Sequence, residues 1–292
     1  MKKILMKLIL IVFILAIILN GKDTLMDLFN PIIDDYGSNY ICVMSREDKT
    51  IKYKKNFNDT SYPASLTKIM TTIVALEHIE DLSAIAPVDI DSYREMVAKN
   101  SSMAGFYGKE KVTYRDLLYG TMLPSGGEAA NSLAIHVTGN VDNFVEMMNE
   151  KAAELKLKNT HFTSPEGLHN KDQYTTAYDM AILLDYALEN GHFRAIFTTD
   201  TFKTTETLDH PNGITLESTV LSELKRINQD GFTIIGGKSG TTYQAGQCWA
   251  TLGIKDGHEY IAIVMGSPLN DLSNPDMKQR DDTIKLYLRI NE

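Results

Sequence analysis

The sequence predicts an α+β fold in which one antiparallel sheet is built from both ends of the chain, with a helical insert between them. Strand-like runs lie near the two ends, at 40–54 and 232–265, and the stretch between them carries apolar residues at helical spacing. A chain of 292 residues that is 43% hydrophobic is long enough to bury a sizeable core. Strands separated in this way bury their apolar faces most simply if they form one sheet and the intervening helices pack against it.

The N-terminus carries a short apolar segment. Met1-Lys2-Lys3 is followed by an unbroken apolar run of twelve residues, Leu8 to Leu19. This run matches the length of a signal-peptide core. No small-x-small cleavage site follows it, so we expect an uncleaved signal-anchor over 1–21, with a cleaved signal as the alternative. The rest of the chain would then lie on the extracytoplasmic face of the cell membrane, or be secreted if the segment is cleaved.

A short linker over 22–38 leads to one predicted domain over 39–292. The domain opens with a hairpin, because polar turn residues separate the strands 40–44 and 50–54. Apolar spacing of three and four then predicts helices over 65–79, 114–123, 128–137, 143–155 and 176–189. Two weak strands, 202–207 and 213–217, flank a turn. Strong strands follow at 232–235, 247–254 and 258–265, and the chain closes in a helix over 276–289.

Composition excludes several classes of protein. A formal charge of −9 and a pI near 5.3 disfavour nucleic-acid binding. Cys42 and Cys248 are too few for a disulfide framework; one bridge is conceivable, but two buried thiols on strands are favoured. The seven histidines are scattered without an H-E-x-x-H pattern, and His161 and His169 lack a third ligand at useful spacing. A zinc peptidase is therefore disfavoured, and we expect no metal or cofactor.

The first motif with chemical content is Ser65-Leu66-Thr67-Lys68, at the start of a predicted helix. Residues three apart share a helix face, so Ser65 and Lys68 would point into one cleft. A serine needs a base to become a nucleophile, and a buried lysine can serve. Alone, the spacing is better explained by a helix-capping serine beside a solvated lysine.

Two further motifs follow along the chain. Pro124-Ser125-Gly126-Gly127-Glu128 lies between two predicted helices, so Ser125 can project from a loop and pass a proton between Lys68 and a leaving amine. Gly236 to Thr242 follows a strand, and its glycines would let a substrate backbone approach that strand closely. There Lys238 can hold a carboxylate with help from the Ser239 and Thr242 hydroxyls. Each motif alone is better explained as a turn.

Together, the three motifs occur in the order found in penicillin-interacting serine enzymes. The chain resembles the low-molecular-mass penicillin-binding proteins that act as D-alanyl-D-alanine carboxypeptidases. The resemblance covers roughly residues 38–270 and extends to Asn159-Thr160-His161-Phe162, Glu166-Gly167-Leu168 and Thr175 to Ala181. It implies a five-stranded antiparallel sheet flanked by helices, with a helical insert.

The resemblance also implies roles, position by position. Ser65 would be the acylated nucleophile, Lys68 its general base and Ser125 a proton relay. Lys238 with Ser239 would bind the terminal carboxylate of a peptidoglycan stem peptide. The strand from Lys238 through Gly240, Thr241 and Thr242 would line the substrate, with the N–H groups of Ser65 and Thr241 as the oxyanion hole. β-Lactams would act as inhibitors.

Three departures from the family pattern stand out. Gly127 replaces the asparagine usual two residues after the loop serine, which predicts that activity is retained but altered, with changed β-lactam sensitivity. No arginine lies close to Gly266-Ser267-Pro268-Leu269, and Arg280 is not assigned to carboxylate binding. Only 27 residues follow Met265, so we expect no C-terminal β-domain or amphipathic anchor.

Two other functions share the fold that the resemblance implies. A β-lactamase would need a glutamate to activate water, and Glu166 to Asn170 offers an E-x-x-x-N pattern whose context fits the carboxypeptidase segment better. A non-catalytic penicillin-binding sensor is supported by Gly127. Turnover of a D-Ala-D-Ala peptide separates the enzyme from the sensor.

Overall fold

The computed structural model describes residues 35–290, so the predicted signal-anchor over 1–21 lies outside the described residues. The chain divides into two compact units, and the fold and site below belong to the second, Gly37–Glu292. Within the described part of the chain, no helix combines the length and apolar character needed to cross a membrane.

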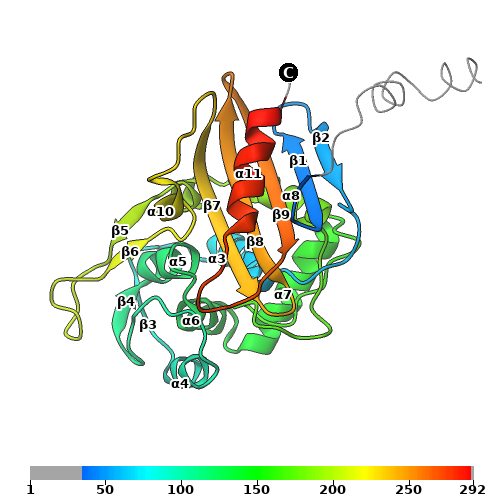
Figure 1. The fold of residues 1–292 in the computed structure, drawn as a ribbon. Coiled ribbons are helices and arrows are strands. Elements are labelled where there is room, and N and C mark those ends of the chain that lie inside the picture. The colour runs from blue at the N-terminus through cyan, green and yellow to red at the C-terminus, as the bar shows by residue number, and fades with distance from the viewer. Residues whose placement is uncertain (1–34, 291–292) are drawn as a thin grey trace, which may run out of the picture. The chain divides into compact units, whose positions relative to one another are not determined.

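A five-stranded antiparallel sheet forms the centre of this unit, in the order β2-β1-β9-β8-β7 (Figure 1). The strands are β1 (Tyr40–Ser45), β2 (Ile51–Lys55), β7 (Thr233–Thr242), β8 (Gly246–Lys255) and β9 (His258–Ser267). Strand β1 pairs with β9 so that Cys42 lies opposite Ile263. The N-terminal hairpin thus joins the C-terminal strands, which confirms the predicted sheet.

Helix α11 (Lys278–Arg289) covers one face of the sheet and packs on β8 and β9 (Figure 1). Its Tyr287 is fully buried, and the hydroxyl donates to the Tyr260 carbonyl at 3.1 Å. A Cβ at Gly253 of β8 would lie 2.5 Å from the Tyr287 ring. The strand therefore requires a glycine where the aromatic ring of the helix rests on it.

Behind the sheet lie the short 3-10 helix η1 (Ala64–Thr67), α3 (Lys68–His78) and α8 (Ala177–Glu189), and α8 packs on β1 and β9 (Figure 1). Every residue of α3 from Lys68 to Leu76 is buried. A helix buried all round is a core element, and this one carries the predicted catalytic lysine at its first position. The predicted helix over 65–79 is confirmed, with its first turn in 3-10 geometry.

The helical insert contains the helices predicted from apolar spacing: α5 (Tyr114–Met122), α6 (Gly127–Thr138) and α7 (Val141–Glu154). It also contains elements that the sequence did not predict: β3 (Ile85–Pro87), α4 (Ile90–Ala98), β4 (Lys111–Thr113), α9 (Gly191–Phe197) and α10 (Leu221–Leu224). In α4 only Ser92 and Met96 are buried, so the helix has no apolar stripe. Its start is stabilised by Asp89, which caps Ser92 N.

The weak strands form a two-stranded ribbon of β5 (Thr201–Lys203) and β6 (Thr215–Glu217), close to their predicted positions. Strand β7 is longer than the predicted run over 232–235, because it continues through the glycine-rich motif to Thr242. Cys42 and Cys248 are free and buried, which confirms the two thiols predicted on strands.

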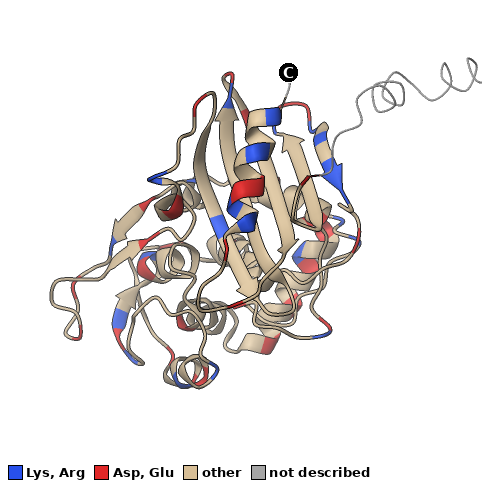
Figure 2. Cartoon of the chain, in the orientation of Figure 1, with Lys and Arg blue, Asp and Glu red and all other residues tan. Residues whose placement is uncertain are grey.

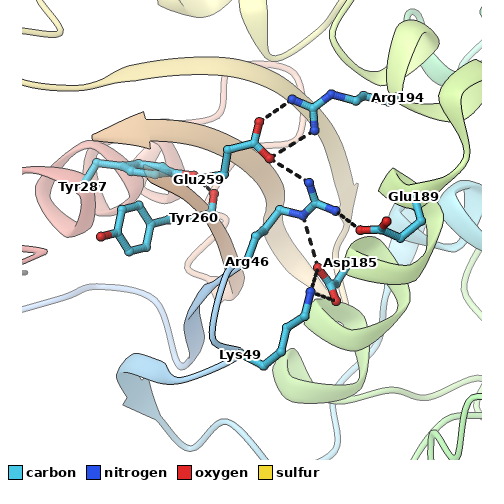
Figure 3. A network of polar contacts seen from close by, with 8 residues as sticks. All are labelled: Arg46, Lys49, Asp185, Glu189, Arg194, Glu259, Tyr260 and Tyr287. Carbon is cyan, nitrogen blue, oxygen red and sulfur yellow. Dashed lines mark hydrogen bonds and ion pairs between the residues drawn. The ribbon is translucent and has the colours of Figure 1, made fainter. Parts of the chain in front are cut away.

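A network of ion pairs joins the sheet to the helices behind it (Figure 3). Arg46 contacts Asp185 at 3.1 Å, Glu189 at 2.5 Å and Glu259 at 2.7 Å, and Arg194 forms a second pair with Glu259. Its members come from β9, α8, α9 and the turn after β1. Figure 2 shows that charged residues of both signs are spread over many helices, strands and loops of the fold. The network therefore clamps one end of the sheet to its helical layer.

Candidate active site

Ser65 lies in the short turn that leads into α3, and it is partly exposed. The preceding Ala64 adopts a positive φ of 47°, which is rare for a residue with a side chain. The Thr67 hydroxyl donates to the Ala64 carbonyl at 2.8 Å and holds this turn. A strained turn at this place presents the serine while the residues on both sides of it stay buried.

Lys68 is the direct partner of Ser65. Its side chain is only 1% exposed, and Nζ lies 3.2 Å from Ser65 Oγ. Nζ also donates to the backbone carbonyl of Glu166. Burial lowers the pKa of Lys68 to about 8, although the carboxylates of Glu166 and Glu128 act in the opposite direction. A lysine with this pKa holds a usable fraction of neutral amine near neutral pH and can act as a general base.

The segment around Glu166 supports the Ser65 turn from the other side. Gly167 has a φ of +80°, and a Cβ there would lie 2.2 Å from the Ala64 carbonyl oxygen. Only glycine permits this approach. Sequence reasoning placed Glu166 and Gly167 in the family-like central segment, but it did not identify the carbonyl of Glu166 as an acceptor for Lys68.

Ser125 is buried in the loop between α5 and α6, in a left-handed conformation with φ of +69°. Its Oγ accepts a hydrogen bond of 2.8 Å from Lys238 Nζ. We expected Ser125 to relay protons for Lys68; the hydrogen bond that the structure shows for its hydroxyl is with the second lysine. The loop serine and the strand lysine, 113 residues apart, therefore meet in one cluster.

Lys238 lies on β7 and is fully buried. Besides Ser125, its Nζ donates to the Ser239 carbonyl at 2.7 Å. Burial lowers the pKa of Lys238 well below its ordinary value, and the positive charge of Lys68 lowers it further. A carboxylate beside Lys238 would act in the opposite direction and favour the charged form of its amine.

The glycines of the β7 motif have separate tasks. A Cβ at Gly236 or Gly237 would collide with Phe197 or Val220, at 2.7 and 2.5 Å. These two glycines make room for protein packing rather than for the approach of substrate that the sequence suggested. At Gly240, a Cβ would lie 2.9 Å from Ser65 N. Gly240 therefore brings β7, and the neighbouring Thr241, against the backbone of Ser65.

Hydroxyl groups complete the lysine cluster. Ser239 Oγ lies 2.7 Å from Thr219 Oγ1, a residue in the loop between β6 and α10 that no sequence motif indicated. Thr242 Oγ1 accepts from Ala245 N at 3.0 Å in the turn after β7. Arg280, left unassigned from the sequence, forms ion pairs with Glu223 and Asp281. Lys238 and Ser239, both expected from the sequence to bind a carboxylate, thus lie together on β7.

Gly127 begins α6 next to the serine loop, and its N–H donates to the Ser102 carbonyl at 2.8 Å. A Cβ on Gly127 would lie 2.7 Å from Ser101 Oγ and 2.8 Å from Met96 Sδ. These two side chains fill the space that an asparagine would need. The neighbouring Glu128 is fully buried and accepts from the backbone N–H groups of Ala104 and Gly105, which fixes the 101–105 segment over the loop.

Comparison with known proteins agrees with this geometry. A family model described as D-alanyl-D-alanine carboxypeptidase matches residues 31–268. The chain is 29% identical over 225 residues to the D-alanyl-D-alanine carboxypeptidase DacF of Bacillus subtilis, covering 77% of this chain and 56% of that protein. It is 34% identical over 223 residues to the carboxypeptidase DacA of Haemophilus influenzae, covering 73% and 53%.

Among solved structures, the Streptomyces K15 DD-transpeptidase superposes with a TM-score of 0.75 at 29% identity, covering 86% of this chain and 97% of that one. That likeness extends over the sheet and the helical insert. The chain spans about half the length of the first two curated relatives named above.

Proposed function

Because the chain belongs to the D-alanyl-D-alanine carboxypeptidase family, we propose that it removes the terminal D-alanine from a peptidoglycan pentapeptide through an acyl-enzyme on Ser65. One observation carries the proposal. The buried Lys68 is hydrogen-bonded to Ser65 Oγ, and a second buried lysine, Lys238, is hydrogen-bonded to Ser125 Oγ. A nucleophile, a base and an anion-binding group thus meet in one site.

Substrate binding begins at the terminal carboxylate. Lys238 Nζ and the Ser239 hydroxyl receive it, and the ion pair offsets the burial that lowers the pKa of Lys238. The scissile carbonyl then lies over Ser65, because β7 passes Ser65 N at Gly240. The carboxylate therefore fixes the register of the peptide relative to the nucleophile.

Acylation follows from the pairing of Ser65 with Lys68. The neutral amine of Lys68 takes the proton from Ser65 Oγ, and the oxygen attacks the carbonyl carbon. The negative charge that develops on the carbonyl oxygen is stabilised by the N–H groups of Ser65 and Thr241, and such a donor contributes about 3 kcal/mol to transition-state stabilisation. The C–N bond then breaks, and D-alanine leaves once its nitrogen is protonated.

Ser125 delivers that proton in the proposed mechanism. Lys238 donates to Ser125 Oγ, so the serine hydrogen is free to point at the departing nitrogen. Lys68 then transfers the proton that it took from Ser65 to Ser125 Oγ, which restores the Ser125 hydroxyl and the neutral form of Lys68. Water then attacks the ester carbon with Lys68 as base, and the bond to Ser65 Oγ breaks to release the shortened peptide.

The test is D-alanine release from diacetyl-L-Lys-D-Ala-D-Ala by the full chain. Ser65→Ala should abolish release, whereas Ser273→Ala, at an exposed serine, should leave it unchanged. Mass analysis after treatment with benzylpenicillin should place the covalent adduct on Ser65. An adduct without D-alanine release would instead indicate a sensor, and rapid hydrolysis of penicillin a β-lactamase.

The proposed place of action is the extracytoplasmic face of the cell membrane, with the chain held by residues 1–21. Support comes from the sequence of that segment and from a substrate that belongs to the cell wall. Cell fractionation tests this proposal. The full chain should sediment with membranes, and a chain beginning at residue 22 should not.

A further inference from the structure

Strand β7 is an edge of the five-stranded sheet, and the pairing of its residues is with β8 on one side. The other edge of such a strand can pair with an extended peptide. If the substrate carboxylate lies at Lys238 and the reacting carbonyl at Ser65, beside Gly240, the direction of the peptide follows. Its acyl portion runs along β7 past Thr242, toward the turn that joins β7 to β8.

A pocket of about 290 Å³ opens at that end of the sheet, beyond the turn that follows β7. Its lining comes from four segments, 39–40, 60–62, 243–246 and 266–269. Tyr62 precedes Ser65 by three residues, and Tyr243 follows Gly240 by three. Since Gly240 lies against Ser65 N and β7 is extended up to Thr242, Tyr243 lies about 10 Å beyond the reacting carbonyl, and Tyr62 lines the same pocket. That length corresponds to two or three peptide residues.

The chemistry of the pocket is that of a neutral site. Among the described residues that line it, none has a charged side chain. Tyr243 is 67% exposed and offers an aromatic face at the rim. Behind the wall, Gln247 Nε2 donates both to the Pro268 carbonyl at 2.7 Å and to the Asp276 carboxylate at 2.8 Å. The Asp276 carboxylate therefore lies behind the pocket, and its negative charge disfavours the binding of an anion.

We propose that this pocket is a subsite for the acyl portion of the substrate, and that it selects a stem peptide whose residue two or three positions before the cleaved bond is neutral. The inference rests on the proposed function for the direction of the peptide. A side-chain amide of the peptide packs there against Tyr62 and Tyr243. A free carboxylate at the same place would lose its hydration without gaining a cationic partner, which costs binding free energy. The protein therefore discriminates between amidated and free-acid stem peptides.

Three peptides test the proposal with the full chain: L-Ala-γ-D-Glu-L-Lys-D-Ala-D-Ala, its isoglutamine form, and the short diacetyl-L-Lys-D-Ala-D-Ala. Wild-type kcat/KM should be higher for the isoglutamine peptide than for the free acid. Tyr243→Ala should lower the ratio of pentapeptide to short-peptide kcat/KM about fivefold, since aromatic anchors of this kind carry much of a binding energy.

Gln244 gives a charge-swap test, because it lines the pocket and is exposed enough to be changed without repacking the core. Gln244→Lys should raise the acid-to-amide ratio of kcat/KM about threefold, and Gln244→Glu should lower it by a similar factor. Each ratio is taken within one variant, so a general loss of activity cancels. An acid-to-amide ratio that is the same in wild type and in both variants would overturn the subsite.

Binding to Ser65→Ala separates this inference from the proposed reaction. Calorimetry on Ser65→Ala, with and without the Gln244 changes, should show the same acid-to-amide preferences in Kd. Charge-dependent binding without D-alanine release from wild type would support the subsite and refute the carboxypeptidase. Release of D-alanine with no charge dependence would support the carboxypeptidase and refute the subsite.

Discussion

The acylation of Ser65 should depend on pH through Lys68. Burial lowers the pKa of Lys68 to about 8, and only its neutral amine can accept the Ser65 proton. About one molecule in ten holds that amine at pH 7, and about one in a hundred at pH 6. The acylation rate should therefore rise roughly tenfold from pH 6 to pH 7 and level off above pH 9.

Glu128→Gln perturbs this dependence in a defined direction. The Glu128 carboxylate raises the pKa of Lys68, against the effect of burial. Glutamine keeps an oxygen that accepts from Ala104 N and Gly105 N, as Glu128 Oε1 does at 2.7 and 3.1 Å. Removing the charge should move the midpoint of the rate profile to lower pH. At pH 7 the gain in rate is limited to about tenfold, because about a tenth of the amine is already neutral.

Stopped-flow acylation by a saturating fluorescent penicillin, from pH 5.5 to 9.5, measures the profile directly. Glu146→Gln, at an exposed site on α7, is the matched control and should follow the wild-type curve. A rate that is flat between pH 6 and pH 8 would refute Lys68 as the base. A Glu128→Gln midpoint equal to that of wild type, in a protein of unchanged thermal stability, would refute the role of the Glu128 charge.

Three further predictions follow from the packing. Gly240→Ala should lower kcat/KM about a hundredfold, since a Cβ 2.9 Å from Ser65 N displaces an oxyanion donor. Gly191→Ala, whose Cβ would meet nothing within 4 Å, is the control. Equal kcat/KM for the two variants would contradict the role given to Ser65 N. Gly127→Asn should lower the free energy of unfolding by about 1–3 kcal/mol and change acylation, because the side chain must displace Met96; unchanged thermal unfolding and acylation would contradict this. Hydrogen bonds from Arg194, then Arg46, lower the pKa of Glu259, so its contribution to stability is present above the ordinary value of 4.5 and is lost as the pH falls below it. Glu259→Gln should flatten this acid dependence in denaturant unfolding, and a parallel curve would contradict it.

The sequence predicted the sheet and the main helices well because these elements have strong periodic patterns. Strands 247–254 and 258–265, joined by an Asp-Gly turn, appear as β8 and β9 with boundaries shifted by at most two residues. Helix α4 was missed because it buries only two residues, and a mostly polar helix carries no apolar period. Strand β7 was cut short because glycines resemble a turn, whereas here they make room for Phe197 and Val220.

The candidate site residues were also identifiable from the sequence, since each motif is local. Ser65 and Lys68 are three residues apart on one helical turn, so their contact follows from the geometry of a single element. The same local information placed Ser125 in a loop and Lys238 in a glycine-rich segment that follows a strand. The family resemblance then supplied the expectation that these separate motifs belong to one site.

Tertiary structure alone decided how the motifs meet. The hydrogen bond between Lys238 and Ser125 joins residues 113 apart in the sequence. The hydrogen bond from Lys68 to the Glu166 carbonyl spans 98 residues, and the contact between Thr219 and Ser239 spans 20. Such contacts depend on how the insert packs against the sheet, which no local pattern encodes. The pKa of Lys68 belongs to the same level, because burial is a property of the packed protein and not of the lysine.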